Sequence, residues 1–513
     1  MPVLLILIGA SLGVLPAQTP LSVTGLVNAA SGVPSSLAGN SAAPHSLSYV
    51  EGAGFTASAR AQLTSSRSGR RFDLPILQRE SSRLLVQIPA IEPGPARLAV
   101  TQATQSTLPA SILPADPGLF SRNGKGWGPA RATVLSPSGR HETGPSRPVR
   151  PGDLVWLAAT GLGRAPAKQV TIVTGGVTAT AEFIQTGSGQ QPDQIRYRIP
   201  AAAPGGCFVP VFLRVGNVTS NSVSLSLDRD GKPCRAPEYF PFANWFGGRS
   251  AFAVLARTIR DGNTVDEALA SFLDLRGVAE PSGPLVYIPP PGLCGTSRAA
   301  IGPETAMSAS FTNLLLSQLQ GKGLNAGRRV TLAVDGNLRA APPRIGAPGV
   351  YVGTLGSDPP EAGRRARPLF YRPGEVRIAA EGGADVPAFA ALANSPATFS
   401  IPNSASLKQI SPNRDLTVTW QGLDAKYIVL TLVLNTSHKA SAGGLCYCTA
   451  QASAGRITVP AYQLQSLPPG SGAEVIVIAI PASATATVPG FPHSLIFGAS
   501  IRVVAAEVLA SGL

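Results

Sequence analysis

Histidines and the common catalytic motifs offer little chemistry in this chain. The four histidines are scattered, and none lies in the His-x-x-x-His or Glu-x-x-His spacing that places zinc ligands on one helix face. His141 precedes Glu142 directly, but Gly, Pro and Ser surround the two residues, which favours a solvated surface pair. There is no Gly-x-Ser-x-Gly elbow, no Gly-x-x-x-x-Gly-Lys loop and no Gly-x-Gly-x-x-Gly turn. We therefore expect no catalytic residue, no metal site and no cofactor.

The 28 acidic residues are dispersed and form no Asp-x-Asp-x-Asp-Gly calcium loop. The nearest approach is Asp-Arg-Asp-Gly at 228–231, which is typical of a tight turn, because Asp and Gly supply turn geometry.

Aromatic residues gather in one stretch, PEYFPFANWFGG, at 237–248. Exposed Trp and Tyr side chains bind sugars and protein partners, so this stretch is either a binding strip or an interdomain wedge, and we favour the wedge. As a binding strip it would offer Tyr239, Phe242 and Trp245. Trp127, which lies between glycines in a loop, is a further candidate contact, although packing at a sandwich end is the favoured alternative.

The N-terminus is typical of an export signal. An apolar run from Val3 to Leu15 precedes Pro-Ala-Gln, and this run is too short to span a bilayer as a permanent helix. We expect a signal peptide over residues 1–18, a secreted or cell-surface bacterial protein, and no transmembrane segment after signal removal.

Export makes disulfide pairing the default for the five cysteines. Cys207 opens one predicted strand and Cys234 follows the next, so this pair is our first expectation. Cys294 can reach either Cys448 or Cys446, and one cysteine is left over. The alternative is that some of the five are buried thiols.

The elements that position these residues are mostly strands. Gly (55) and Pro (48) are too dense for long helices and suit short strands joined by turns. A near-repeat, LLVQIPAIEPGP at 84–95 and IRYRIPAAAPGG at 195–206, indicates duplicated units. One helix is expected from Thr264 to Leu273, with Thr264 and Glu267 as a capping box, and a second over 312–323. Five further strand candidates lie between 415 and 509.

We therefore predict a mainly β chain of tandem immunoglobulin-like β-sandwiches, a small helix-containing insert and a C-terminal β-sandwich. The expected segments are a signal peptide (1–18), sandwich 1 (19–110), sandwich 2 (111–235), a helix-containing Pro-rich insert (236–323), a β-rich segment (324–400) and the C-terminal sandwich (401–513).

Several stretches resemble a domain family of exported acidobacterial proteins. They are VTGLVNAASG at 23–32, ADPGLFSRNGKGWGPA at 115–130, RPGDLVWLAATGLG at 150–163, VTGGVTATAEF at 173–183 and SNSVSLSL at 220–227. The resemblance implies immunoglobulin-like (TIG-like) sandwiches in a secreted chain, and it implies no catalytic role.

The formal charge of +14 is typical of proteins that bind nucleic acids. The arginines are scattered along the sequence, however, and no nucleic acid is expected as a partner. We expect a structural or binding protein without catalysis that contacts polysaccharide or a surface protein through sandwich loops. The rival expectation is an exported hydrolase with a site assembled from the 236–323 insert and the C-terminal domain.

Overall fold

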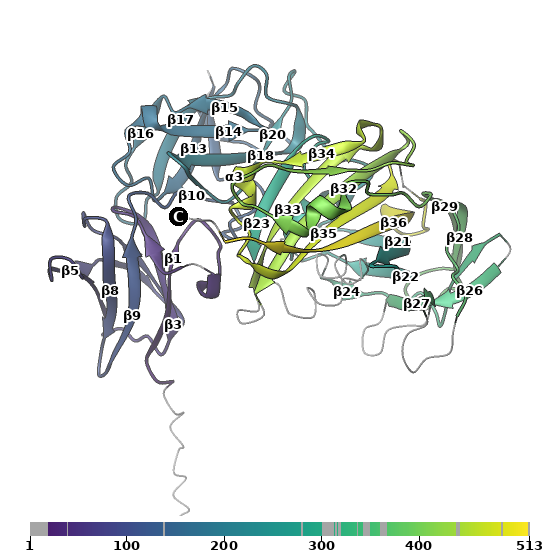
Figure 1. The fold of residues 1–513 in the computed structure, drawn as a ribbon, viewed down its shortest axis with the longest axis horizontal. Coiled ribbons are helices and arrows are strands. Elements are labelled where there is room, and N and C mark those ends of the chain that lie inside the picture. Colours follow the sequence, from purple (N-terminus) through teal and green to yellow (C-terminus); the bar gives the residue numbers. More distant parts are fainter. Residues whose placement is uncertain are drawn as a thin grey trace, which may run out of the picture.

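The computed structural model shows a chain built almost entirely of strands (Figure 1). It describes residues 19–37, 39–136, 139–278, 281–299, 312, 315, 320–335, 337–341, 349–359, 367–437, 442–483 and 486–510. The predicted signal peptide lies outside the described residues, as does most of the second predicted helix. No helix of the described part is long and apolar enough to cross a membrane.

The first sandwich pairs two sheets, of strand order β1-β3-β7-β6 and β2-β9-β8-β4-β5, around a core that includes Leu26, Val50 and Leu98. Its strands are β1 (Ser22–Asn28), β2 (Ser41–Ala42), β3 (Leu47–Ala53), β4 (Arg60–Ser65), β5 (Arg71–Leu74), β6 (Ile76–Arg79), β7 (Arg83–Gln87), β8 (Gly94–Thr101) and β9 (Gln105–Ile112), with a 3₁₀ turn η1 (Ser35–Leu37).

The second sandwich repeats this plan. One sheet has the order β12-β11-β13-β17-β16 with β10 on β13, and the other has β15-β14-β18-β19 with β20 on β18. Its elements are β10 (Gly118–Leu119), β11 (Ala132–Ser136), β12 (Gly139–Glu142), β13 (Leu154–Thr160), η2 (Ala167–Gln169), β14 (Val170–Thr174), β15 (Val177–Thr180), β16 (Phe183–Gln185), β17 (Asp193–Arg198), β18 (Gly206–Val215), β19 (Val218–Thr219) and β20 (Val223–Leu227).

The repeated Ile-Pro phrase occupies the same corner of both sandwiches. Ile88 follows β7 and Ile199 follows β17, and both side chains are buried in their cores. The glycine that opens the next strand has nearly the same positive φ in each copy, +149° at Gly94 and +153° at Gly206. Only glycine adopts this conformation readily, so the phrase marks a duplicated turn.

A large sheet forms the third body, with the order β23-β33-β32-β35-β36-β21-β22-β24, and with β27 on β22 and β30 on β36 (Figure 1). Its strands are β21 (Arg249–Arg260), β22 (Asn263–Asp274), β23 (Cys294–Ala299), β24 (Lys322–Gly323), β27 (Val350–Asp358), β30 (Gln409–Ile410), β32 (Tyr427–Ser437), β33 (Ala442–Gln451), β35 (Gly470–Pro481) and β36 (His493–Val508). Strands from all three expected segments after residue 236 share this sheet, and the segment boundaries themselves stay predictions.

Both faces of the large sheet are covered. Along β32, Leu430 and Leu432 point into one core, whereas Val429 and Val433 point into another. The smaller sheets are β26-β25-β28-β29 and β31-β34. The remaining elements are η3 (Pro241–Asn244), η4 (Pro284–Val286), β25 (Val330–Val334), β26 (Asn337–Ala341), β28 (Gly374–Ala380), β29 (Phe389–Ser395), η5 (Ser404–Lys408), β31 (Leu416–Thr419), η6 (Ala452–Ala454), β34 (Arg456–Val459) and α3 (Ala461–Leu464).

The predicted helix from Thr264 to Leu273 is wrong, because this stretch is strand β22. It pairs with β21 along its whole length, across a two-residue turn at Asp261-Gly262 where both residues have positive φ. An Asp-Gly pair between apolar runs is a strong hairpin signal. Because β22 buries both faces, Leu269 into one core and Ala270 into another, its apolar run is continuous and imitates a helix stripe.

Candidate functional site

The four aromatic residues expected as possible contacts are all buried. Trp127, Tyr239, Phe242 and Trp245 are 3%, 8%, 0% and 1% exposed. Phe242 packs edge-on against Trp245, with ring centroids 4.6 Å apart, and both belong to the core on one face of the large sheet. The idea of an exposed binding strip is therefore wrong, and the favoured packing role fits what the structure shows.

Trp127 belongs to a different contact. Its ring centroid lies 6.0 Å from that of Tyr287, the residue after η4, and the Lys125 ammonium lies 5.4 Å above the indole. Tyr287 also meets Phe208 of β18 edge-on at 5.2 Å. These rings join the second sandwich to the segment that leads into β23, so Trp127 acts in packing between bodies.

The cysteines pair as the sequence analysis expects. Cys207 bridges to Cys234 and Cys294 to Cys448, with Cα separations of 5.5 and 4.0 Å. Of the two partners left open for Cys294, the structure selects Cys448, which lies opposite it in the β23–β33 register. Cys446 is the remaining thiol, and its burial raises its pKa to about 12.

Nothing in the described part of the chain resembles a metal centre. No group of three or more His, Cys, Asp and Glu side chains there could hold an ion. Asp228 instead accepts backbone hydrogen bonds from Asp230 and Lys232, at 2.9 and 2.8 Å, as a turn residue does.

Sequence reasoning missed a row of side chains on the second sandwich. The strand register aligns five neighbours across the outer face of the β12-β11-β13-β17-β16 sheet, in the order Glu142, Thr133, Trp156, Arg196 and Phe183. We call this surface, with Arg140 of β12, Gln185 of β16 and Gln194 of β17, the arginine face. It is hollowed by a depression of about 440 Å³.

Aromatic rings lie within cation–π distance of two arginines of this face. The Arg140 guanidinium lies 4.5 Å above the Trp156 ring, and Arg196 lies 5.6 Å from Trp156 and 5.5 Å from Phe183. Phe183 is 45% exposed although it is a large apolar side chain. A stacked guanidinium keeps its planar donors available at its edge, which suits bidentate binding of a carboxylate or sulfate.

Few carboxylates balance these arginines. Glu182 lies 3.7 Å from Arg196 and 3.4 Å from Arg198, and Glu142 lies 3.5 Å from Arg122. Arg131 and Arg140 also line the depression and are exposed. With five arginines against two glutamates, the arginine face and its edge carry a net positive charge.

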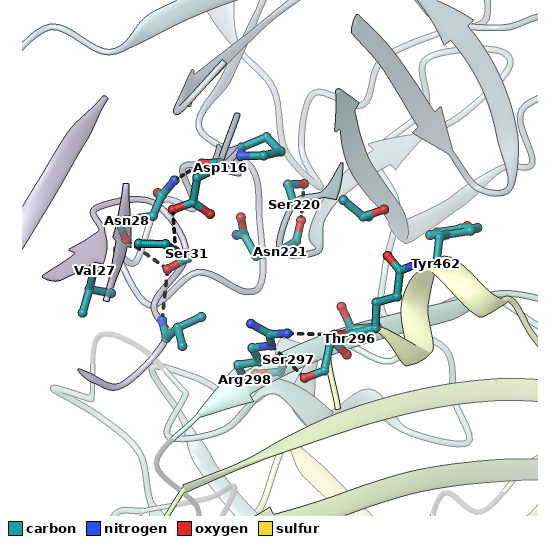
Figure 2. A pocket seen from close by; sticks show the side chains of 16 residues that line it. Val27, Asn28, Ser31, Asp116, Ser220, Asn221, Thr296, Ser297, Arg298 and Tyr462 are labelled. Carbon is teal, nitrogen blue, oxygen red and sulfur yellow. Dashed lines mark hydrogen bonds between the residues drawn. The ribbon is translucent and has the colours of Figure 1, made fainter. Parts of the chain in front are cut away.

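A second site lies where the three bodies meet, and we call it the junction cavity (Figure 2). Its volume is about 120 Å³. The first sandwich contributes Ser31 and Ser41, the second contributes Asp116, Thr219 and Ser220, and the third contributes β23 and the residues around α3. Figure 2 shows the Asp116 carboxylate and the Arg298 guanidinium on opposite walls.

Two asparagine side chains hold the backbone on the side of the cavity that carries Asp116. The Asn28 side chain donates to the Asp116 carbonyl oxygen at 2.5 Å and accepts from the Ala30 N–H at 2.9 Å. The Asn221 side-chain amide donates to the carbonyl of Ala30 in the first sandwich, at 3.3 Å, and to the carbonyls of Leu119 and Gly126 in its own sandwich, at 2.9 and 2.7 Å. These two asparagines tie the sandwiches together beside the cavity.

Burial perturbs both charged groups of the cavity. Desolvation raises the pKa of Asp116 to about 6, against the opposing effects of a hydrogen bond from Ser41 and the charge of Arg298. Desolvation likewise lowers the pKa of Arg298, and the charge of Asp116 opposes that shift. The charge of each group thus affects the pKa of the other across the cavity, although these two described side chains make no direct ion pair.

No protein-family model matches the chain, and no curated protein matches it in sequence. Solved structures match it at low similarity. One is SGBP-B of the Bacteroides ovatus mixed-linkage glucan utilization locus, in complex with a mixed-linkage heptasaccharide. Its identity is 9%, coverage is 82% of this chain and 93% of that one, and the TM-score is 0.14.

Murine CEACAM1b matches at 10% identity, with 37% of this chain and 96% of that one covered and a TM-score of 0.12. Dpr2 Ig1-Ig2 in complex with DIP-Theta matches at 10% identity, with coverage of 41% and 94% and a TM-score of 0.14. At these scores the matches carry no argument about function.

Proposed function

We propose that this protein is an exported, non-catalytic polysaccharide-binding protein, and that the arginine face of its second sandwich contacts a glycan that bears carboxylate groups. The observation that carries this proposal is the stacking of Arg140 and Arg196 against Trp156 on a solvent-facing sheet. Membership of the exported acidobacterial family with TIG-like domains is part of the same proposal.

The chemistry of the face favours a glycan over a protein partner. Protein interfaces have an apolar centre depleted of charge, whereas the depression here is lined mainly by arginine, glutamine and threonine side chains. Gln185 and Gln194 lie opposite each other in the β16–β17 register, so their amides form a polar pair beside the arginines. Amides suit sugar hydroxyls, and the flat guanidinium groups suit uronate carboxylates.

The proposal moves the contact from the sandwich loops, where the sequence analysis places it, to a sheet face. The row from Glu142 to Phe183 crosses five strands, which are spaced about 4.8 Å apart, and so extends for about 19 Å. A linear polysaccharide can follow such a row over several sugar units. The rival hydrolase remains the second hypothesis, and the same experiment separates the two.

The test is affinity electrophoresis and calorimetry of the mature chain with polygalacturonate, with neutral dextran as the comparison. We expect binding of polygalacturonate alone. Arg140→Ala should weaken it about tenfold, since a hydrogen bond to a charged group contributes about 1.5 kcal/mol or more, and Trp156→Ala should weaken it at least as much because the arginines lose their support. Arg97→Ala, an exposed arginine on β8 of the first sandwich, is the matched control.

Four outcomes contradict the proposal. One is equal binding of dextran and polygalacturonate. Another is an equal loss of affinity in Arg97→Ala and Arg140→Ala, which indicates unspecific attraction by the basic surface. The third is the release of new reducing ends from the polysaccharide, which favours the hydrolase hypothesis. Tighter binding of single-stranded DNA than of polygalacturonate also contradicts it.

A further inference from the structure

The junction cavity holds two opposite charges that are not joined to each other. Asp116 comes from the second sandwich, just before β10, and Arg298 comes from β23 of the large sheet. Both line the same cavity of about 120 Å³ (Figure 2). Buried charges are normally paired, because leaving either one unpaired in a low-dielectric interior is strongly unfavourable.

Arg298 is fixed so that one edge of its guanidinium group faces the cavity. Nε donates to the Ser466 carbonyl and Nη2 to the Gln465 carbonyl, each at 2.7 Å. These two bonds use the Nε–Nη2 edge. The Nη1 side remains directed to the cavity, as Figure 2 shows, where it can bind a carboxylate.

Asp116 is positioned on the opposite wall. Its Oδ2 accepts a long hydrogen bond of 3.4 Å from the Ser41 hydroxyl, and its backbone carbonyl is held by Asn28. A carboxylate has about four acceptor sites, so this one bond leaves capacity for a cationic donor in the cavity.

One hydroxyl group of the lining points to the same conclusion. Thr219 Oγ1 is a buried atom that has no hydrogen-bond partner within the described part of the chain. A buried polar atom without a partner destabilises the fold by about 1 to 3 kcal/mol, so such atoms are normally satisfied by water or by a ligand.

The size of the cavity limits its occupant. Pockets for drug-sized ligands are roughly 300–1,000 Å³, and this one is well below that range. It is too small for an oligosaccharide, so its ligand differs from the one proposed for the arginine face.

We propose that the junction cavity binds a small zwitterion with a carboxylate and a protonated amine on one short framework, such as an amino acid. The carboxylate pairs with the free edge of Arg298, and the ammonium group donates to Asp116. The hydroxyl of Thr219 completes the hydrogen bonds. Because all three bodies line the cavity, a bound ligand contacts each of them and stabilises their arrangement.

The experiment is calorimetry with the full mature chain and four probes, namely glycine, β-alanine, acetate and methylammonium. We expect glycine or β-alanine to bind, and the singly charged probes to bind at least about tenfold more weakly, since each lacks one charge-assisted contact. Asp116→Asn and Arg298→Gln should each weaken the zwitterion about 10- to 100-fold. Asp424→Asn, an exposed carboxylate of the third body, is the matched control and should bind like the wild type.

Thr219→Val guards against variants that fail to fold. It replaces one hydroxyl with a methyl group of similar size without touching either charge, and it should weaken binding about 3- to 10-fold. The proposal is overturned if neither zwitterion binds at about 10 mM, if acetate binds as tightly as glycine, or if Asp116→Asn keeps wild-type affinity. Polygalacturonate binding should be the same in Asp116→Asn as in the wild type, so failure at the cavity is distinguishable from failure at the arginine face.

Discussion

Replacing Asp116 with Asn should stabilise the protein at neutral pH while it weakens zwitterion binding. In the folded protein, burial raises the pKa of this carboxyl group from 3.8 to about 6. A raised pKa means that the folded state holds the proton more tightly than the unfolded chain does. The contribution of this carboxyl group to the free energy of unfolding is therefore fully present below about pH 4, and it is lost as the pH rises through about 6.

The magnitude follows from the shift. The difference between about 6 and 3.8 is about 2 pKa units, and each unit corresponds to about 1.4 kcal/mol, which gives about 3 kcal/mol above pH 6. Asp116 lines a cavity and is only partly buried as a residue. Screening by water in the cavity reduces the expected effect to about 1 to 2 kcal/mol.

The assay is urea denaturation of the wild type and Asp116→Asn at several pH values, without ligand. The two proteins should be equally stable at about pH 4, and the variant should be more stable by about 1 to 2 kcal/mol at about pH 7.5. Asp424→Asn should track the wild type throughout, because the Asp424 side chain is 71% exposed.

Two results would refute this reasoning. If Asp116→Asn is less stable than the wild type at neutral pH, the carboxylate is satisfied within the protein and needs no ligand. If the difference between the two proteins does not change with pH, the carboxyl group does not titrate in the expected range. Either result contradicts the inference that the Asp116 carboxylate lacks a partner in the ligand-free cavity and destabilises the fold there.

Three further predictions concern the framework. Alkylation without reductant should label Cys446 alone, and only after denaturation, because this thiol is buried and its raised pKa of about 12 suppresses the thiolate; a second labelled cysteine contradicts the two bridges. Replacing Cys207 and Cys234 with Ser should reduce stability by about 3 kcal/mol in thermal unfolding, since the bridge closes a loop with a sequence separation of 27; an unchanged midpoint contradicts it. Asp266→Ala should destabilise the protein by about 3 to 5 kcal/mol in urea denaturation. The reason is that the fully buried carboxylate binds Arg257 through both oxygens, at 2.7 and 2.8 Å, and accepts hydrogen bonds from the N–H groups of Phe370 and Tyr371. A loss of less than about 1 kcal/mol contradicts this prediction.

Local patterns predicted the strands and bridges well because each depends on a short stretch. The five strand candidates between 415 and 509 all form strands, and Cys207 and Cys234 pair as expected. The same local reading failed at Thr264–Leu273. Periodicity alone cannot distinguish a strand that is buried on both faces from a helix, and the Asp261-Gly262 turn was the signal that could have corrected it.

The candidate sites could not be predicted because each is assembled from distant residues. The row on the arginine face depends on the register of five strands, and no stretch of sequence shows that Trp156 lies beside Arg196 and near Arg140. The cavity joins Asp116 to Arg298 across 182 positions (298 minus 116). A single sequence does not show which residues pair across neighbouring strands, and it does not show how one body packs against another.

The segments that carry the family resemblance do more than mark a fold, since several of them meet at the junction cavity. A side chain at Gly32 would collide with the Lys125 carbonyl, and one at Gly126 would collide with the Ser31 carbonyl, so the Asn-Ala-Ala-Ser-Gly turn and the Gly-Lys-Gly loop pack backbone to backbone. Gly161 likewise approaches the Asp116 carbonyl. Glycine is required at these positions by close approach and positive φ. A molecule that binds only to the assembled walls stabilises that assembly by its own binding free energy, so occupancy of the cavity and the docking of the three bodies are thermodynamically linked.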